Sequence, residues 1–202
     1  MSKLEFFYDF SSPFAYLGST QIEALAERAG AELIWRPMLL GGVFKALNGP
    51  VVPIATFTDS KRRHYLRDLH RWAEHWGAPF TWPSNFPMLT LKPLRLALAL
   101  GREACPPFVH ATFRAYWSDG RDISSLDVLG EILDDLGLSR VLLERTADPA
   151  VKQELIDSTE EAVARGVFGA PTCFVDTDLM FWGQDRFDFV ERALGGWRPT
   201  AG

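Results

Sequence analysis

Ser12 and Pro13 stand where an apolar segment gives way to a helical pattern. A serine before a proline is a good helix start, because its hydroxyl accepts a hydrogen bond from the first turn and proline needs no N–H there. The same helix end presents free N–H groups and a positive dipole, which stabilise an anion and lower the pKa of a thiol. Ser12 therefore predicts either an ordinary cap or a donor that activates the sulfur of a bound thiol.

The chain's own cysteines do not offer a reactive pair. Cys105 and Cys173 are far apart in sequence and form neither a Cys-x-x-Cys motif nor a zinc-binding spacing. A disulfide between them stays open, although a reduced intracellular protein is the simpler interpretation. The four histidines share no face and no ligand spacing, so no metal site is expected.

Two segments near the end of the chain contain residue types that suit the binding of a peptide ligand. The stretch over residues 168–172, Phe-Gly-Ala-Pro-Thr, leads into an expected strand and is either a plain strand-entry turn or a backbone edge for an extended peptide. Further on, Gly183 allows close backbone approach, and the N–H groups of Gln184 and Asp185 can hold a carboxylate. The Asp185 side chain can pair with an ammonium or can serve only as a cap.

The elements that must position these residues follow from apolar periodicity and from Gly and Pro punctuation. A strand over residues 3–9, a helix over 13–29 and a strand over 32–36 form a β-α-β unit, which favours a parallel strand pair. Almost no strand signal appears from 46 to 147. We expect helices in this region over residues 62–76, 91–102, 106–118, 125–136 and 139–146. After it we expect a helix over 148–165, strands over 172–175 and 179–182, and a last helix over 184–194.

This order predicts an α/β, thioredoxin-like fold with a large all-helical insertion. Residues 1–45 and 148–202 are expected to form the thioredoxin-like domain, and residues 46–147 the insertion. With 202 residues, one domain is the default.

Charge and hydropathy exclude several classes of function. The net charge is -5, so the chain lacks the basic balance of a nucleic-acid-binding protein. Basic residues gather around Lys61 and Arg67, but acids interrupt them, and a solvated helix face is expected. No run is long and apolar enough for a membrane span, and the first residues do not resemble a signal peptide. The expected setting is the cytoplasm.

The opening segment also resembles a known family. Residues 7–17, Phe-Tyr-Asp-Phe-Ser-Ser-Pro-Phe-Ala-Tyr-Leu, are similar to the start of 2-hydroxychromene-2-carboxylate isomerases and kappa-class glutathione transferases, in the DsbA-like branch of the thioredoxin superfamily. Ser12 to Ala15 stand where redox members carry Cys-x-x-Cys, so disulfide exchange is not expected. The resemblance implies glutathione as cofactor. It implies glutathione contacts at Ser12, Pro13, Phe14, Asn48, Lys61, Ala170, Pro171, Gly183, Gln184 and Asp185.

The resemblance also assigns roles within that set. Ser12 hydrogen-bonds the glutathione sulfur, Pro171 is a cis proline, and the segment from Gly183 to Asp185 binds the γ-glutamyl end. The helical insertion covers the active site, with Lys45, Asn85 and Phe86 in the pocket of the second substrate. The loop over residues 49–53 departs from the kappa pattern.

The expected activity is a glutathione-dependent cis-trans isomerisation. The resemblance implies conversion of 2-hydroxychromene-2-carboxylate, a small aromatic carboxylate, to trans-o-hydroxybenzylidenepyruvate during aromatic degradation, by a homodimer. Two alternatives stay open: a kappa-like glutathione transferase or peroxidase, and a non-catalytic glutathione-binding or thiol-disulfide protein. In the last case Cys173, close to Pro171, is the residue that a minor redox role would use.

Overall fold

The computed structural model describes residues 2–200 and is built around one sheet. Its four strands, β1 (Lys3–Tyr8), β2 (Glu32–Pro37), β3 (Thr172–Val175) and β4 (Leu179–Trp182), lie in the order β2-β1-β3-β4. β1 and β2 are parallel, whereas β3 runs antiparallel to β1 and β4 antiparallel to β3. The parallel pair and the bounds of both late strands confirm the sequence predictions.

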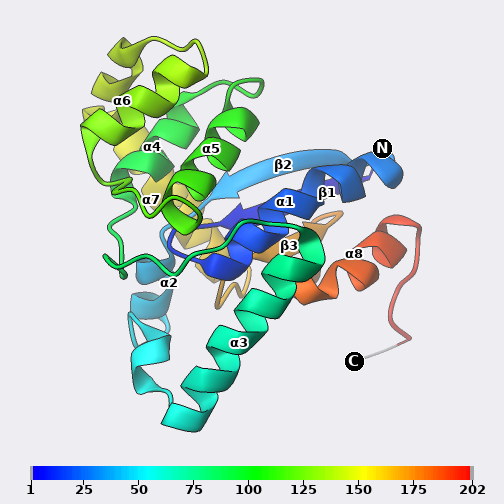
Figure 1. Cartoon of the computed structure of the whole chain (residues 1–202). Coiled ribbons are helices and arrows are strands. Elements are labelled where there is room, and N and C mark those ends of the chain that lie inside the picture. The colour runs from blue at the N-terminus through cyan, green and yellow to red at the C-terminus, as the bar shows by residue number, and fades with distance from the viewer. Residues whose placement is uncertain (1, 201–202) are drawn as a thin grey trace.

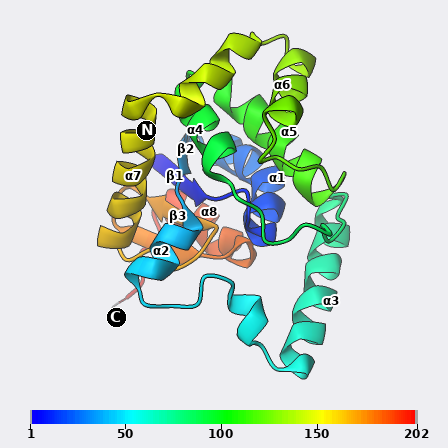
Figure 2. The same cartoon turned by 90° about the vertical axis from the view of Figure 1, so that its left-hand side faces the viewer.

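Apolar side chains cover both faces of β1. Phe6 and Phe7, which point to opposite faces of a strand, are both fully buried. On the Phe6 face, Gly18 of α1 (Pro13–Arg28) lies against the rings of Phe6 and Phe187, so α1 and α8 (Phe187–Leu194) cover this side. On the other face, Arg165 at the end of α7 (Pro149–Ala164) lies over the rings of Phe7 and Phe174. Figure 2 shows the strands between α7 and α1.

The remaining helices gather at one end of the sheet and beside α1. They are α2 (Leu40–Ala46), α3 (Asp59–Trp76), α4 (Leu91–Ala99), α5 (Cys105–Trp117) and α6 (Leu126–Asp135), with 3-10 helices η1 (Pro53–Thr56), η2 (Arg140–Ala147) and η3 (Gln184–Arg186). Figure 1 shows α4, α5 and α6 as one block, with α3 extending away from it. The fold class, thioredoxin-like with a helical insertion, is confirmed; the division at residues 45 and 148 stays a prediction.

Several helix bounds differ from the predictions. α3 begins three residues earlier, because Thr58 caps it by accepting a hydrogen bond from the Lys61 N–H. The segment predicted as a helix over 139–146 is 3-10 rather than α, and the last helix begins with the 3-10 turn η3 before α8. α4 ends at Ala99, short of residue 102. Asp148 caps α7 with Pro149 as its first residue, as predicted.

An aromatic core joins the insertion to the sheet beside the Ser12 turn. The Phe10 and Phe113 rings are 4.8 Å apart, and both residues are fully buried. Trp117, also fully buried, donates from Nε1 to the Phe10 carbonyl oxygen at 2.9 Å. The end of α5 therefore fixes the backbone two residues before Ser12.

No helix within the described range has the length and apolarity that crossing a membrane requires.

Candidate active site

The Ser12 turn links the end of β1 to α1. The Ser12 N–H donates to the Asp9 carbonyl oxygen at 3.0 Å, which closes the turn. The Ser12 hydroxyl oxygen accepts from the Ala15 N–H at 3.1 Å, so the predicted cap is confirmed. Pro13 has no N–H, which leaves the Phe14 N–H as a first-turn donor without an intrahelical acceptor. An electronegative atom placed outside this turn would meet that N–H and the positive end of the helix dipole.

The segment before β3 comes to the same turn. The Ser12 hydroxyl donates to the Ala170 carbonyl oxygen at 2.8 Å, and both residues are buried. The Ala170–Pro171 peptide bond is cis, as the family resemblance implied. The Thr172 hydroxyl donates back to the Gly169 carbonyl oxygen at 2.8 Å and holds this segment in shape. Ser12, Ala170 and Pro171 are thus brought together as predicted.

Two exposed aromatic rings flank this segment. Phe168 is 45% exposed and Trp182 51%, and their ring centroids are 5.0 Å apart. A Cβ on Gly169 would lie 2.4 Å from the Trp182 indole nitrogen, so the indole rests on the glycine backbone. Large apolar side chains exposed next to a polar turn are typical of a binding surface.

The backbone at Gly183 continues the site away from Ser12. Its N–H donates to the Pro171 carbonyl oxygen at 2.9 Å, and its φ of 99° lies in the region that favours glycine. A Cβ there would lie 2.5 Å from Asp185 Oδ1. The Asp185 carboxylate therefore lies against the Gly183 backbone; the close approach of a ligand at this glycine stays a prediction.

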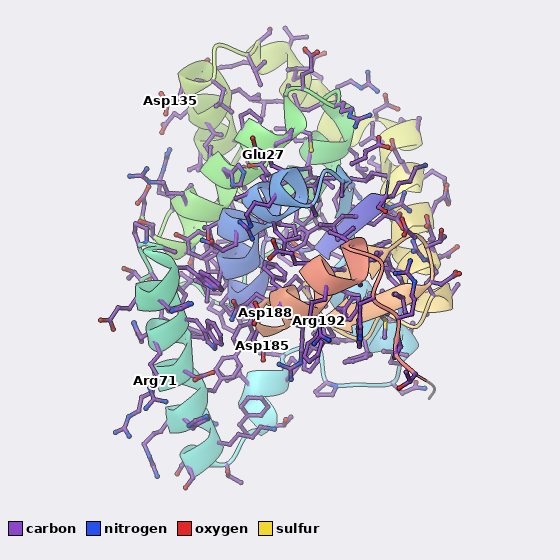
Figure 3. The ribbon with its side chains drawn as sticks, turned by 90° about the vertical axis from the view of Figure 1, so that its right-hand side faces the viewer. Glu27, Arg71, Asp135, Asp185, Asp188 and Arg192 are labelled. Atoms are coloured by element: carbon purple, nitrogen blue, oxygen red, sulfur yellow. The ribbon has the colours of Figure 1, made fainter. Side chains whose placement is uncertain are left out.

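Gln184 and Asp185 have different surroundings. Gln184 is 1% exposed, and its side-chain oxygen accepts from Trp76 Nε1 at 2.6 Å, which ties η3 to α3. Asp185 is exposed and forms an ion pair with Arg186 at 2.6 Å. Figure 3 shows Asp185 at the end of α8 that faces α3. Of Gln184 and Asp185, Asp185 is the one whose side chain is exposed and charged, and Arg186 lies beside it.

The first turns of α1 and α3 form a second wall. The Phe14 ring meets the Tyr65 ring edge-on at 5.3 Å, and Tyr65 in turn meets Phe57 at 5.5 Å. The Lys61 ammonium lies over the Phe57 ring, 4.1 Å from its centroid. Burial raises the pKa of Tyr65 to about 12, so its hydroxyl stays neutral and can donate. Lys61 supplies an exposed cation at the rim.

The other predicted contacts are spread over the insertion. Phe86 packs on Trp82 and Trp117, with ring centroids 4.8 and 6.2 Å apart, and so is linked through Trp117 to the Ser12 turn. Asn48 and Asn85 are exposed, and within residues 2–200 neither forms a backbone hydrogen bond with that turn. Lys45 lines a cavity between α2, α4 and α7 whose lining includes neither Ser12 nor Pro171.

Sequence reasoning assigned no role to Asp9, although it holds the turn in place. It is 1% exposed; Oδ1 accepts from the Ser11 N–H at 2.9 Å and Oδ2 from the Leu40 N–H at 2.7 Å. Burial raises the pKa of its carboxyl, against the lowering effect of these two bonds. A lone acid within the aromatic run of residues 6–10 was the available signal.

Neither cysteine has the surroundings of a reactive thiol. Both are free and buried, and burial raises the pKa of Cys105 to about 11 and that of Cys173 further. A disulfide between them is not formed. In residues 2–200 no three His, Cys, Asp or Glu side chains are grouped as a metal site would need.

Comparison with known proteins adds independent findings. A family model described as a DSBA-like thioredoxin domain matches residues 3–195. The chain is 34% identical to a 2-hydroxychromene-2-carboxylate isomerase of Sphingobium xenophagum, over 95% of this chain and 97% of that protein. It is 27% identical to glutathione S-transferase kappa 1 of Homo sapiens, over 95% and 90%. A solved structure of a 2-hydroxychromene-2-carboxylate isomerase gives a TM-score of 0.83 at 28% identity, covering 96% and 95%.

Proposed function

The chain belongs to the DsbA-like thioredoxin family, together with the 2-hydroxychromene-2-carboxylate isomerases, and from that membership we propose that it is a glutathione-dependent isomerase. The observation that carries the proposal is the contact of the Ser12 hydroxyl with the Ala170 carbonyl. Through this contact the Ser12 hydroxyl, the N-terminus of α1 and the backbone of Ala170 lie next to one another. These are the groups that a peptide thiol requires.

The residues at the site fit glutathione from end to end. The Phe14 N–H and the Ser12 hydroxyl are donors for a thiolate, and the Ala170 backbone suits the central peptide unit. Gly183 and Asp185 suit the γ-glutamyl end, because the Asp185 carboxylate is exposed and attracts an ammonium. Lys61, at the opposite wall, suits the glycyl carboxylate.

The Ser12 hydroxyl has one hydrogen, and this has a consequence for binding. It cannot donate to the Ala170 carbonyl and to a sulfur at the same time. We propose that the hydroxyl rotates to the sulfur when glutathione binds, and that the freed Ala170 carbonyl accepts the peptide N–H of the ligand. One hydrogen bond within the protein is thereby exchanged for two to the ligand, which favours the ionised thiol.

Bound glutathione would supply a thiolate that adds to a conjugated carbon of the substrate and leaves again, so that the intervening double bond becomes single, rotates and reforms. Ser12 and the helix N-terminus keep the sulfur ionised and act as positioning groups rather than nucleophiles. The aromatic surface of Trp82 and Phe86, over Trp117, and the exposed Asn85 amide suit a flat aromatic carboxylate. No net redox change is required.

A kappa-type transferase or peroxidase is the second candidate, because the chain is also similar to a kappa-class relative. It would use the same thiolate but a different acceptor. A thiol-disulfide function is disfavoured by Ser12 and Ala15 in place of a thiol pair and by the buried Cys173. We also propose, from the family resemblance, that the protein acts as a homodimer in the cytoplasm.

Product analysis separates these functions. The enzyme is incubated with 2-hydroxychromene-2-carboxylate and glutathione, with S-methylglutathione as the thiol-free control. We expect the trans-o-hydroxybenzylidenepyruvate isomer with free glutathione fully recovered, and no acceleration with the S-methyl control. A stable conjugate would assign the transferase activity instead, and acceleration without the thiol would contradict both candidates.

A further inference from the structure

A cavity of about 620 Å³ lies between α2, α4 and α7, away from the Ser12 turn. That volume is within the range of about 300–1,000 Å³ typical of small-molecule sites. Its walls are mainly aliphatic: Leu39, Leu91, Leu155, Ile156 and Val163 line it. Ile156 and Leu91 are exposed by 48% and 37%, although they are large apolar side chains. An apolar hollow of this size is suited to the body of a small organic ligand.

The charged residues of this cavity are unbalanced. Three cations, Lys45, Arg95 and Lys152, line it with one acid, Glu160. In residues 2–200 none of these cations forms an ion pair with a carboxylate. Such cations around an apolar hollow attract an anion.

Arg95 is half-buried, and part of its guanidinium is enclosed. Its Nη1 donates to the Thr146 carbonyl oxygen at 3.3 Å, which anchors the side chain. Its Nε is buried and has no acceptor within the described residues. A buried donor without a partner costs stability, so an anion that reaches this guanidinium gains a charge-assisted hydrogen bond.

The lining of the cavity includes no residue of the Ser12 turn or of the segment from Ala170 to Asp185. Gly42 of α2 packs against Thr159 of α7, and Lys45 follows one turn later on the same helix face. Figure 2 shows α2 with α7 on one side and α3, which carries Lys61, on the other. A ligand in the cavity and a ligand at Ser12 can therefore be bound together.

We infer that this cavity is a second ligand site, for an aliphatic monocarboxylate. The chain of the ligand packs on the leucine and isoleucine side chains, and its carboxylate lies against Arg95, with Lys45 and Lys152 at the rim. The site is separate from the Ser12 turn, with which it shares no lining residue.

Calorimetry with octanoate, and with octanamide as the neutral probe of the same length, tests this inference. We expect one octanoate per chain and binding of octanamide at least about tenfold weaker. Arg95→Gln should weaken octanoate binding about tenfold or more. Lys152→Gln, a change at the rim that leaves the fold intact, should weaken it about threefold. Arg67→Gln on α3 removes an exposed charge elsewhere and should change nothing.

The inference is wrong if octanoate does not bind, if octanamide binds equally well, or if Lys152→Gln binds like the wild type. Saturating glutathione provides the positional control. Unchanged octanoate affinity in its presence supports a separate site. Displacement of octanoate by glutathione would place the probe at Ser12 and overturn the inference.

Discussion

The hydroxyl of Ser12 donates to the carbonyl oxygen of Ala170 at 2.8 Å, across 158 residues of sequence. The contact joins the first helix to the last strand pair at the point where the family's redox members carry a thiol. It also makes the donor for the sulfur and the acceptor for the peptide into partners of each other.

Ser12→Ala removes the cap of α1 and leaves the buried Ala170 carbonyl without its donor. We expect turnover to fall, together with a loss of about 2 kcal/mol in unfolding free energy. Ser125→Ala is the matched control, because Ser125 caps α6 far from the site by accepting from the Asp127 N–H. Urea unfolding should show a loss of about 1 kcal/mol in the control, with turnover unchanged. Equal turnover in both variants would remove Ser12 from the mechanism.

Gly169→Ala should displace Trp182, because the new Cβ would lie 2.4 Å from the indole nitrogen. We expect weaker glutathione binding and an altered tryptophan emission spectrum. Gly101→Ala is the control, since a Cβ there meets nothing within 4 Å. If Gly169→Ala binds glutathione like the wild type, Trp182 has no part in the site.

Trp76→Phe deletes the donor to the buried Gln184 side chain and so loosens α3 from η3. An unpartnered buried amide should cost about 1–3 kcal/mol in unfolding free energy. Hydrogen exchange should quicken in the last turn of α3. Trp72→Phe is the control for the loss of ring size. The Trp72 indole stacks on that of Trp76 and forms no hydrogen bond within residues 2–200. Exchange that is equally fast in both variants would argue against the Gln184 contact.

Asp9→Asn tests the buried carboxylate through pH. The pKa of Asp9 is raised in the folded state above its unfolded value of 3.8, so the folded protein holds the proton more tightly. Protonation of Asp9 therefore adds to the free energy of unfolding at low pH, and this contribution is lost as pH rises through the pKa of Asp9 in the folded state. The stability difference between wild type and Asp9→Asn should therefore shrink as pH rises from about 4. Urea titrations at several pH values measure it; a pH-independent difference would mean that the pKa is not shifted.

The two cysteines should be unreactive in the folded protein, because both are buried and burial raises both pKa values. Ellman's reagent should label two thiols per chain in denaturant and none quickly in buffer. Rapid labelling of one thiol in the native protein, absent in Cys173→Ala, would restore the redox alternative.

Much of the fold can be predicted from local sequence pattern, and two segments show the limit of such prediction. The strand β3 lies between Pro171 and a turn, and the sequence predicts its bounds correctly. The segment at 139–146 was predicted as an α-helix but is a 3-10 helix. Eight residues contain too few repeats of the apolar pattern to distinguish the pitch of a 3-10 helix from that of an α-helix.

The site shows the same division. The cap formed by Ser12 is predictable because its partner, the Ala15 N–H, is local, whereas the cis bond at Pro171 was implied by the family resemblance. The role of Asp9 is not predictable, because its partner Leu40 lies 31 residues away and only the fold supplies it. The substrate contact predicted for Lys45 stays a prediction; the packing of Gly42 on Thr159 sets the rotation of α2, and Lys45 lines the cavity between α2, α4 and α7. A residue type can be read from a pattern, whereas the face it occupies depends on packing.

The most direct test of the central claim is an ultraviolet titration of the thiolate of glutathione bound to the wild type and to Ser12→Ala. The proposal predicts that the wild type lowers the pKa of the bound thiol below that of free glutathione. It predicts that Ser12→Ala raises this pKa back toward the free value while glutathione still binds. If the thiol titrates at the same pH in both proteins, or as in free glutathione, Ser12 does not stabilise a bound thiolate.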